Sequence, residues 1–501
     1  MPEQRYRHLE TADNPQQLRR VAIDPVTRVE GHGKVTLLLD DHNRVRQARL
    51  HIVEFRGFEK FIQGRPYWEV PVLVQRLCGI CPVSHLLAAA KAVDRLVGVA
   101  QLTPGAEKLR RLLHYGQILQ SHALHFFHLA SPDLLFGFDS EAEQRNIMEL
   151  LRSDQFRQIG LEGIRLRKFG QEVIKAVIGK RIHGTGPLPG GMNKHLTAHD
   201  RTHLEKDLDQ VIAWSLNGLE LIRRLYLANA DYHQRFAVIR SHFMALVTAD
   251  GGLELYNGCL RLKGIDGQIL NDQICDQEYT RFIHEQVKSW TYMKFPYFAE
   301  LGPEEGWYRV GPLARINCCD YIDSPLAEQA RREFMQLDDG LPVQASLAFH
   351  WARMIEILHC AEKIRELLAD PALYSGELMV SGEKTHEGIG IIEAPRGVLI
   401  HHYRVNDEGL ITKANLIVST THNNTAMNES VRQVAAEYLD GRKLTEPLLN
   451  RIEIAIRAYD PCLSCATHAI GKMPLEVTLV DSSGQTLHRL LKQGDGTVTP
   501  G

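Results

Sequence analysis

Alternating apolar and polar positions predict a β-hairpin near the N-terminus. Residues 35–53 contain two runs in which apolar, mainly aliphatic residues alternate with polar ones, and the polar turn DDHN separates the runs. Two such runs joined by a short polar turn are typical of a hairpin. We therefore expect a small sheet in this region.

From residue 83 onward, apolar residues recur with the three- and four-residue spacing of amphipathic helices. One helix is expected to start with Thr103 as N-cap and Pro104 in its first turn, and to run to about Ala130. The other predicted helical stretches are 83–98, 141–180, 198–232, 342–369 and 445–459. We predict a mainly α fold of the α+β class, a bundle of long helices with small peripheral β-sheets.

Glycine and proline mark the expected loops. Residues 181–197 and 371–397 are rich in both and are predicted to be irregular, whereas 475–481 (LEVTLVD) has a strand pattern. No internal repeat or clear linker divides the chain, so a single large domain is expected.

Composition excludes several classes of function. The chain has 501 residues, with 58 Lys and Arg against 61 Asp and Glu, so it offers no basic stripe for nucleic acid. No apolar run approaches the roughly 18 to 20 residues that span a bilayer, and the N-terminus lacks an apolar signal segment. We expect a cytoplasmic protein without direct membrane insertion, although a subunit can be exported with a partner that carries the signal.

Four of the nine cysteines form two CxxC pairs, Cys78 with Cys81 and Cys462 with Cys465. Thiolates at this spacing select zinc, iron–sulfur clusters or other thiophilic metals. Zinc ribbons separate their pairs by about 15 to 20 residues, whereas roughly 380 separate Cys81 from Cys462. A buried catalytic centre is therefore favoured over a structural zinc or iron–sulfur interaction protein. The five remaining cysteines are expected to be structural: Cys259, Cys275, Cys318, Cys319 and Cys360.

The segments around these pairs carry a family resemblance. R-x-C-G-x-C-P-x-x-H at 76–85 and D-P-C-x-x-C-x-x-H at 460–468 resemble the paired signatures of nickel–iron hydrogenase large subunits. Further matching motifs are DPVTRVEGH (24–32), FRGFE (55–59), HALHFFHLASPD (122–133), EAPRG (393–397) and LIVSTT (416–421). The amino-acid sequences of the two cysteine motifs are most similar to those of the NAD-reducing, bidirectional subgroup. Uptake and deazaflavin-reducing hydrogenases remain alternatives, while the related quinone-site subunit of respiratory complex I lacks the nickel cysteines.

The resemblance implies reversible heterolytic cleavage of H2 at a nickel–iron centre whose iron carries carbon monoxide and cyanide. Cys78 and Cys462 would bind nickel terminally, and Cys81 and Cys465 would bridge the two metals. The Cys462 thiolate would be the first proton acceptor, and Glu30 would take the proton from it.

Other site residues follow from the same resemblance. Arg396 would be suspended over the metals with Asp133 as its carboxylate partner, and His85 would hydrogen-bond a bridging thiolate. Backbone groups around Pro395 and the Thr420 hydroxyl would hydrogen-bond the cyanides.

Two positions depart from the family pattern beside that cyanide pocket. Many relatives have proline where Ser419 stands and tryptophan where His422 stands. Nearby, Glu59, the Leu416 carbonyl and His468 match the ligands of a magnesium ion.

The resemblance also implies partners. The chain contains no G-x-G-x-x-G dinucleotide motif, so its electrons should leave through an iron–sulfur small subunit and a flavin-bearing diaphorase. A maturation endopeptidase and nickel-insertion factors are expected as well.

The endopeptidase should remove residues 469–501 after His468, leaving a catalytic domain of residues 1–468. Before cleavage, a tail packed elsewhere could hold Cys462 and Cys465 away from the first cysteine pair. The alternative is a harmless extension whose LEVTLVD segment adds an edge strand.

Overall fold

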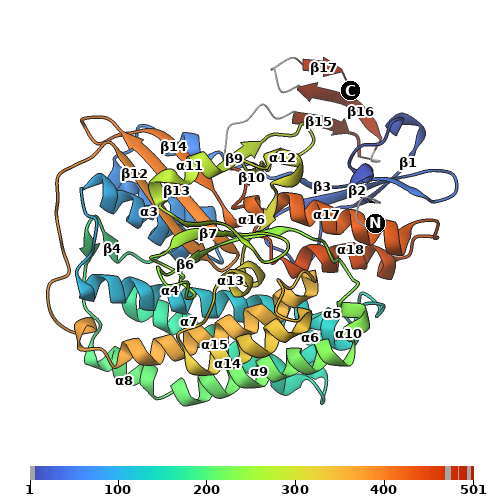
Figure 1. Cartoon of the computed structure of the whole chain (residues 1–501). Helices are drawn as coiled ribbons and strands as arrows, with labels where there is room; N and C mark the ends of the chain where they lie inside the picture. The colour runs from blue at the N-terminus through green and yellow to red at the C-terminus, as the bar shows by residue number, and fades with distance from the viewer. Residues whose placement is uncertain (1–5, 469–474, 483–484, 493–497, 501) are drawn as a thin grey trace.

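Long helices fill one side of the molecule and small sheets lie on the other, as Figure 1 shows. The computed structural model describes residues 6–468, 475–482, 485–492 and 498–500. Helix α4 (Pro104–Leu124) packs along α7 (Arg157–Ile178) and α15 (Phe349–Leu368), and α15 also packs along α9 (Leu208–Ala228). Their apolar faces belong to one continuous core, which confirms the predicted bundle of long helices.

Helix α4 begins as predicted. The Thr103 hydroxyl accepts a hydrogen bond from the Ala106 backbone N–H at 3.3 Å, and Pro104 occupies the first turn. Beyond Leu124 the chain continues as a π-helical segment to Ala130. The predicted stretches 141–180 and 198–232 are each broken into shorter helices, and the stretch from 342 becomes helical only at Ser346.

The remaining helices are mostly short. They are α1 (Phe58–Phe61), α2 (Val70–Val74), α3 (Pro82–Leu96), α5 (Ser131–Phe136), α6 (Ile147–Arg152), α8 (Ala198–Glu205), α10 (Ala230–His233), α11 (Tyr279–Phe282), α12 (Gly302–Glu305), α13 (Pro312–Cys318), α14 (Pro325–Phe334), α16 (Ser419–His422), α17 (Asn424–Val434) and α18 (Glu446–Ala458). Helix α18 occupies the predicted 445–459 stretch and leads directly to the second cysteine pair.

The predicted hairpin is present as β2 (Gly33–Leu39) and β3 (Val45–Ile52), which pair antiparallel and are joined on one edge by β1 (Arg19–Ile23). A four-stranded sheet has the order β11-β6-β7-β8, and a three-stranded one has the order β12-β13-β14. Their strands are β6 (His242–Val247), β7 (Cys259–Lys263), β8 (Ile269–Ile274), β11 (Tyr308–Arg309), β12 (Glu387–Ala394), β13 (Gly397–Val405) and β14 (Ile411–Ile417). Two-stranded pairs are β4 (Pro187–Leu188) with β5 (Gly191–Met192), and β9 (Ile283–Gln286) with β10 (Phe295–Phe298).

The expectation of a loop over 371–397 is wrong for its last third, because strand β12 lies there and is largely buried. The loop was predicted from the glycine and proline content of this segment. A Cβ atom at Gly390 would lie 2.2 Å from the Ala88 carbonyl oxygen, and one at Gly388 would lie 2.1 Å from that of Ala92. These glycines let helix α3 pack directly on the strand, so they mark close packing here and not a turn.

The C-terminal segment forms its own sheet. Strand β15 (Leu475–Val480) confirms the predicted strand at 475–481, and it pairs with β16 (Thr486–Lys492), which pairs with β17 (Val498–Pro500). In Figure 1 this sheet stands apart from the helical layer, next to the N-terminal sheet. The strand therefore does not extend another sheet of the described chain.

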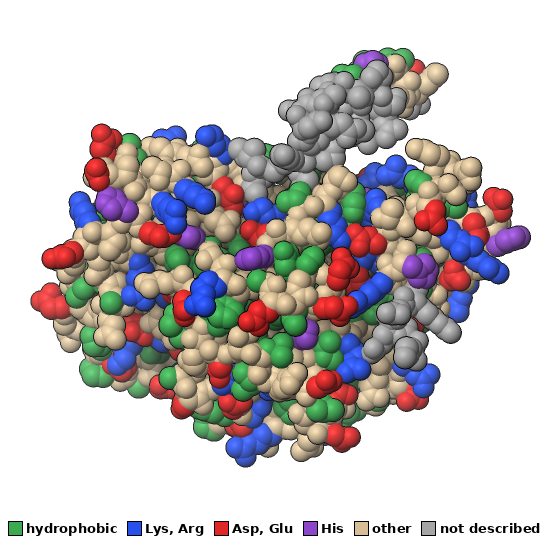
Figure 2. Space-filling model, turned by 45° about the horizontal axis from the view of Figure 1, so that its top comes forward, with side chains coloured by type: hydrophobic (Ala, Val, Ile, Leu, Met, Phe, Trp, Pro, Cys, Tyr) green, Lys and Arg blue, Asp and Glu red, His purple; other side chains and the backbone are tan. Residues whose placement is uncertain are grey.

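Charges of both signs are interspersed over the face drawn in Figure 2, in agreement with the balanced composition. Among the described residues, no helix combines the length and the apolar character that are needed to cross a bilayer.

Candidate metal centre

The four cysteines of the CxxC pairs come together in the structure. Their sulfur atoms all lie within 4.8 Å of one another, and all four residues are buried. The sulfurs of Cys78 and Cys462 are 3.3 Å apart, and those of Cys462 and Cys465 are in direct contact. Four sulfurs about 2.3 Å from one metal would be roughly 3.8 Å apart, so the cluster has the size of a thiolate metal site.

Local backbone structure positions the first cysteine pair. Cys78 ends a 3-10 turn (Gln75–Leu77) and Cys81 caps helix α3, so the backbone N–H groups of Ile80 and Cys81 both donate to Cys78 Sγ at 3.2 Å. Burial opposes ionisation of Cys78, but the Cys81 thiol and the Arg396 guanidinium lower the pKa of its thiol overall. A metal ligand must be a thiolate, and these groups favour that form.

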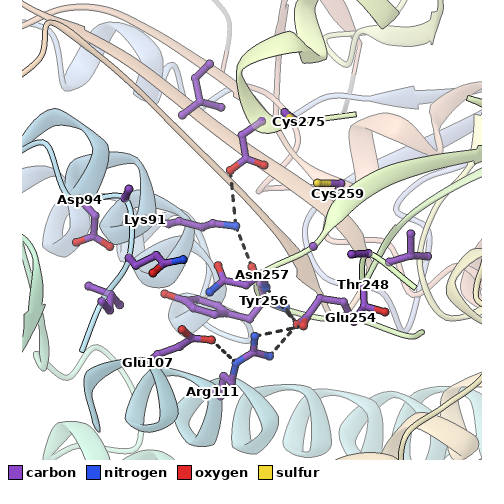
Figure 3. A pocket seen from close by; sticks show the side chains of 18 of the residues that line it. Lys91, Asp94, Glu107, Arg111, Thr248, Glu254, Tyr256, Asn257, Cys259 and Cys275 are labelled. Carbon is purple, nitrogen blue, oxygen red and sulfur yellow. Dashed lines mark hydrogen bonds and ion pairs between the residues drawn. The ribbon is translucent and has the colours of Figure 1, made fainter. Parts of the chain in front are cut away.

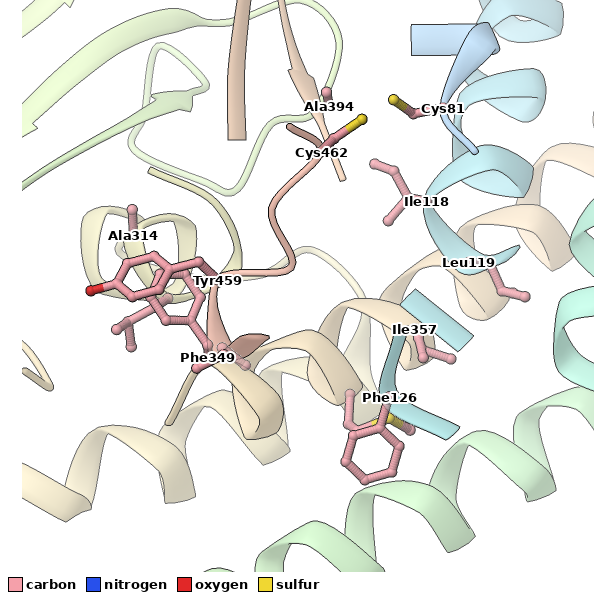
Figure 4. Close-up of a cluster of buried hydrophobic side chains, with 14 of the residues drawn as sticks. Cys81, Ile118, Leu119, Phe126, Ala314, Phe349, Ile357, Ala394, Tyr459 and Cys462 are labelled. Atoms are coloured by element: carbon pink, nitrogen blue, oxygen red, sulfur yellow. The ribbon is translucent and has the colours of Figure 1, made fainter. Parts of the chain in front are cut away.

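The C-terminal pair is tied to the N-terminal part of the chain. The Leu463 N–H donates to the Glu30 carbonyl oxygen at 2.9 Å, and the Arg56 N–H donates to the Thr467 carbonyl oxygen at 3.1 Å. Figure 4 shows Cys81 and Cys462 on separate segments with their side chains turned toward each other, beside apolar residues such as Ile118 and Ala394. All four cysteines belong to the main apolar core.

Glu30 lies where the resemblance expects it. Its Oε2 atom is 3.0 Å from Cys462 Sγ and accepts a hydrogen bond from the Ser464 N–H at 3.2 Å. The Ser464 hydroxyl contacts the other oxygen of the carboxylate. Glu30 is half-buried, so its carboxylate connects the sulfur cluster with the protein surface.

The predicted pair between Arg396 and Asp133 is wrong. The Arg396 guanidinium donates to the Asp460 carboxylate at 3.0 Å and to the Asp460 carbonyl oxygen at 2.5 Å. Asp133 instead accepts from Arg28 at 2.6 Å and from Arg457 at 2.5 Å. It lies among the arginines that join the N-terminal segment to helix α18, so it does not support Arg396 directly.

Arg396 keeps one buried donor free of protein partners. Among the described residues, its Nη1 atom has no hydrogen-bond acceptor, although the side chain is buried. Burial lowers the pKa of this guanidinium, but the Asp460 carboxylate and the Cys81 and Cys78 thiols raise it overall, which keeps it charged. An unpaired N–H on a charged group in a buried site is suited to hold a small ligand.

His85 is buried beside the first cysteine pair, and its Nδ1 atom shares a hydrogen bond with His401 Nε2 at 3.1 Å. His401 in turn shares a hydrogen bond with the Tyr403 hydroxyl at 2.5 Å. Burial lowers the pKa of His85 far below its usual value and that of His401 to about 3. Both imidazoles are therefore neutral, and the expected bond from His85 to a thiolate stays a prediction.

The groups predicted to adjoin the cyanides also accept hydrogen bonds within the protein. The Cys462 N–H donates to the Thr420 hydroxyl at 3.0 Å, and the Pro395 carbonyl oxygen accepts from Arg315 at 3.0 Å. At the two positions that depart from the family pattern, Ser419 donates to the Gly397 carbonyl oxygen at 2.7 Å and His422 shares a bond with Tyr308 at 2.7 Å. Ser419 is thus satisfied within the fold, whereas the buried Nε2 atom of His422 has no hydrogen-bond partner among the described residues.

The residues predicted to bind magnesium are Glu59, Leu416 and His468. Glu59 Oε1 accepts from the Leu416 N–H at 2.8 Å, and burial raises the pKa of its carboxyl group. His468 is buried, and its Nδ1 atom has no partner among the described residues. Phe58, adjacent to Glu59, packs edge-on against the His468 ring at 5.8 Å.

Asp460, Ser464 and His401 are contacts that sequence reasoning missed. Asp460 and Ser464 belong to the quoted D-P-C-x-x-C motif, so their place beside Cys462 could have suggested a role. His401 had no such signal, because only the pairing of β13 with β14 and the packing of α3 bring it to His85.

The expectation that the tail holds the two cysteine pairs apart is also wrong, since the four sulfurs meet while strands β15–β17 are present.

Comparison with known proteins agrees with this centre. The model of the family "Nickel-dependent hydrogenase" matches residues 56–139 and 261–468, and a model described as HoxL-like matches residues 20–55. The beta subunit of the NAD-reducing hydrogenase HoxS of Cupriavidus necator is 47% identical over 486 residues, covering 94% of this chain and 99% of that protein. The alpha subunit of sulfhydrogenase 2 of Pyrococcus furiosus is 30% identical, covering 90% and 99%.

Solved structures give the same result. A crystal structure of an NAD+-reducing [NiFe]-hydrogenase in the H2-reduced state superposes with a TM-score of 0.88 at 56% identity, covering 90% of this chain and 99% of that one. The [NiFeSe]-hydrogenase of Dm. baculatum, at 23% identity and a TM-score of 0.72, shares the fold. The family match, the identities and the four convergent cysteines agree: the chain belongs to the nickel-dependent hydrogenase family, as a large subunit whose four cysteines are the candidate metal ligands.

Proposed function

We propose that this hydrogenase subunit cleaves H2 reversibly and passes the electrons, through partner subunits, to NAD. The observation that carries the proposal is the cluster of four buried sulfurs with the Glu30 carboxylate 3.0 Å from one of them. The similarity to an NAD-reducing enzyme at 47% identity supports NAD as the final acceptor, over a deazaflavin or a membrane-linked uptake chain.

Cys78 and Cys462 would hold nickel terminally, while Cys81 and Cys465 would bridge it to an iron with carbon monoxide and cyanide ligands. When bound, this centre supplies the redox and Lewis-acid chemistry that splits H2. Soft thiolates in an apolar surrounding fit such metals, and the buried positions of the four side chains exclude bulk water.

Cys462 and Glu30 would move the proton. The Cys462 sulfur accepts it, and the carboxylate oxygen 3.0 Å away takes it onward. Ser464 holds that carboxylate by its N–H and its hydroxyl, so the oxygen stays within reach of the sulfur. Because Glu30 is only half-buried, the proton can continue toward the surface.

Arg396 would stand over the metals and steady the diatomic ligands or the substrate with its Nη1 donor, which has no acceptor in the described part of the chain. Asp460 orients this guanidinium. Thr420 and the backbone at Pro395 would adjoin the cyanides, and His85 would tune a bridging thiolate from outside the ligand set.

A magnesium ion would be held by Glu59, the Leu416 carbonyl and His468. The Nδ1 atom of His468, which has no partner among the described residues, and the buried Glu59 carboxylate support this assignment. A carboxyl group whose pKa is raised by burial is stabilised in its charged form when a cation is next to it.

The electrons would leave through an iron–sulfur small subunit and a flavin-containing diaphorase. The relative's name as a subunit of an NAD-reducing hydrogenase supports such an assembly. A nickel-insertion system and a maturation endopeptidase would act on the chain before assembly, and the cytoplasmic location stays a prediction.

Residues 469–501 would be removed after His468, which leaves the catalytic domain 1–468. Two findings support the cut: the family match ends at residue 468, and the similar crystal structure is 99% covered while covering 90% of this chain. Since the sulfurs already meet with the tail present, the cut would not be needed to bring them together.

Metal analysis and the variant Glu30→Gln test the proposal together. Active protein should contain about one nickel and one iron per chain and show infrared bands of metal-bound carbon monoxide and cyanide. Glu30→Gln keeps the size of the side chain but removes its ionisable group, so H2–D2O exchange should fall by roughly 10²- to 10⁴-fold with normal metal content. Stoichiometric zinc without nickel in active protein would overturn the metal assignment. Near-normal exchange in the fully metallated variant would remove Glu30 from the proton path.

A further inference from the structure

A cavity of about 1500 Å³ lies apart from the candidate metal centre, and none of its four cysteines lines this cavity. Its walls come from α3, α4, the four-stranded sheet and β12 with β13, and they carry charges of both signs. Two cysteines line it, Cys259 and Cys275 (Figure 3). From the sequence alone both are expected to be structural.

These two cysteines lie at adjacent ends of two paired strands, Cys259 at the start of β7 and Cys275 directly after β8. Leu260 of β7 is paired with Ile274 of the antiparallel β8, and one further step in this register sets Cys259 opposite Cys275. Directly opposed residues in an antiparallel pair have Cα atoms about 4.5 to 5.5 Å apart, which lies within the range of about 4.4 to 6.8 Å found for disulfides. The Cys275 thiol is also near enough to Cys259 to raise the pKa of the Cys259 thiol.

The two thiols differ in accessibility. Cys275 is exposed, whereas Cys259 is half-buried at the start of a strand that pairs on both sides. Burial, the neighbouring Cys275 and the Asp276 carboxylate raise the pKa of the Cys259 thiol. The Lys91 ammonium, 3.6 Å from Asp276, is the cation near this pair. Cys275 is therefore the thiol that an external reagent meets first.

A metal site explains the pair less well. In the part of the chain that the structure describes, the only group of three or more His, Cys, Asp or Glu side chains with ligand geometry is the one formed by the four CxxC cysteines. Within those same described residues, Cys259 and Cys275 have no third ligand of this kind within range, so two thiols are left that can react with each other.

We propose that Cys259 and Cys275 form a reversible redox site, a dithiol that closes to a cross-strand disulfide by exchange with a small-molecule disulfide of the glutathione type. In the first step the Cys275 thiolate attacks one sulfur of that molecule, whose S–S bond breaks and releases one thiol. In the second step the Cys259 thiolate attacks the Cys275 sulfur and expels the second thiol. Two protein thiols are oxidised, one external disulfide is reduced to two thiols, and these carry away the two protons.

Closure would cross-link the edge strand β8 to β7. Strand β7 pairs in turn with β6, whose Leu246 N–H donates to Glu393 at 2.9 Å. Glu393 directly precedes the Ala394–Arg396 turn, so strand pairing and one side-chain hydrogen bond connect the redox site to the segment that bears Arg396.

Peptide mapping of the assembled enzyme tests the proposal without reference to its activity. Trypsin cuts after Arg261 and Lys263, so Cys259 falls in peptide 241–261 and Cys275 in peptide 264–281, each with no other cysteine. Enzyme treated with oxidised glutathione, alkylated and digested should yield these two peptides joined by a disulfide. The amount should be at least ten-fold above that in untreated enzyme, and dithiothreitol should reverse it.

Single variants separate the two steps. Cys259→Ser should accumulate a stable glutathione adduct on Cys275, because the resolving thiol is missing. Cys275→Ser should show at least ten-fold slower modification of Cys259. The buried neighbours Cys318 and Cys319 are internal controls and should stay unmodified in the native enzyme. A persistent glutathione adduct on Cys275 in the unaltered enzyme, or full alkylation of both thiols after oxidation, would overturn the proposal.

Discussion

Replacing Asp133 with asparagine distinguishes a structural role from the catalytic one that the family motif suggests. Its carboxylate accepts from Arg28 and Arg457, and the Asn450 amide adds a bond at 3.3 Å. The new amide side chain would present an N–H group to one of the arginines, leaving a buried charge without its partner. Such losses cost about 3 to 5 kcal/mol. Because the m value in urea should be roughly 3 kcal/mol/M or larger for a chain of this size, the urea midpoint should fall by up to about 1 to 1.7 M.

Asp139→Asn is the matched control. Asp139 pairs with Arg451 at 2.7 Å, but its own side chain is 69% exposed, so this loss should cost less than about 1 kcal/mol. The urea midpoints of both variants are compared with that of the unaltered chain in identical preparations, followed by fluorescence. If Asp133→Asn unfolds with the unaltered chain yet loses H2 oxidation completely, the structural assignment is wrong and the residue acts in the chemistry.

Three further outcomes are expected. Despite its burial, Glu254 has a pKa of about 2 because Arg111 donates to both its oxygens. The pKa of a glutamate is near 4.3 in the unfolded chain, so the stability that ionised Glu254 contributes to the folded protein should fade from about pH 5 toward pH 2. In acid titration, the variant Glu254→Gln should not show this part of the loss of stability. Gly390→Ala should destabilise the chain by about 1 to 3 kcal/mol in urea titration, because its Cβ would meet Ala88 of helix α3; an unchanged midpoint would contradict that packing. Mass spectrometry of active enzyme should find a chain that ends at His468, and an intact chain with full nickel would refute the cut.

The sequence predicted the convergence of the four thiols because their motifs are short, contiguous and specific to one chemistry. It could not choose the partner of Arg396, since Asp133 and Asp460 both stand in matching motifs and only tertiary packing decides which carboxylate reaches the guanidinium. Strand β12 was missed because glycine is ambiguous between a turn and close packing. The pair of Cys259 with Cys275 depends on strand register, which spacing along the chain does not determine.

The two halves of the metal site are 384 residues apart in the chain, and this separation constrains when the site can exist during synthesis. At about 5 to 20 residues per second, the ribosome needs roughly 20 to 75 seconds to extend the chain from the first cysteine pair to the second. During that interval Cys78 and Cys81 have only half of their ligand set and could bind only metals that accept two thiolates. Glu30 and Arg56 likewise lack the backbone partners that the segment 463–467 later provides. A centre that needs all four cysteines can therefore form only after translation is nearly complete, so the order of the two motifs along the chain would delay metal loading until both pairs have been synthesised.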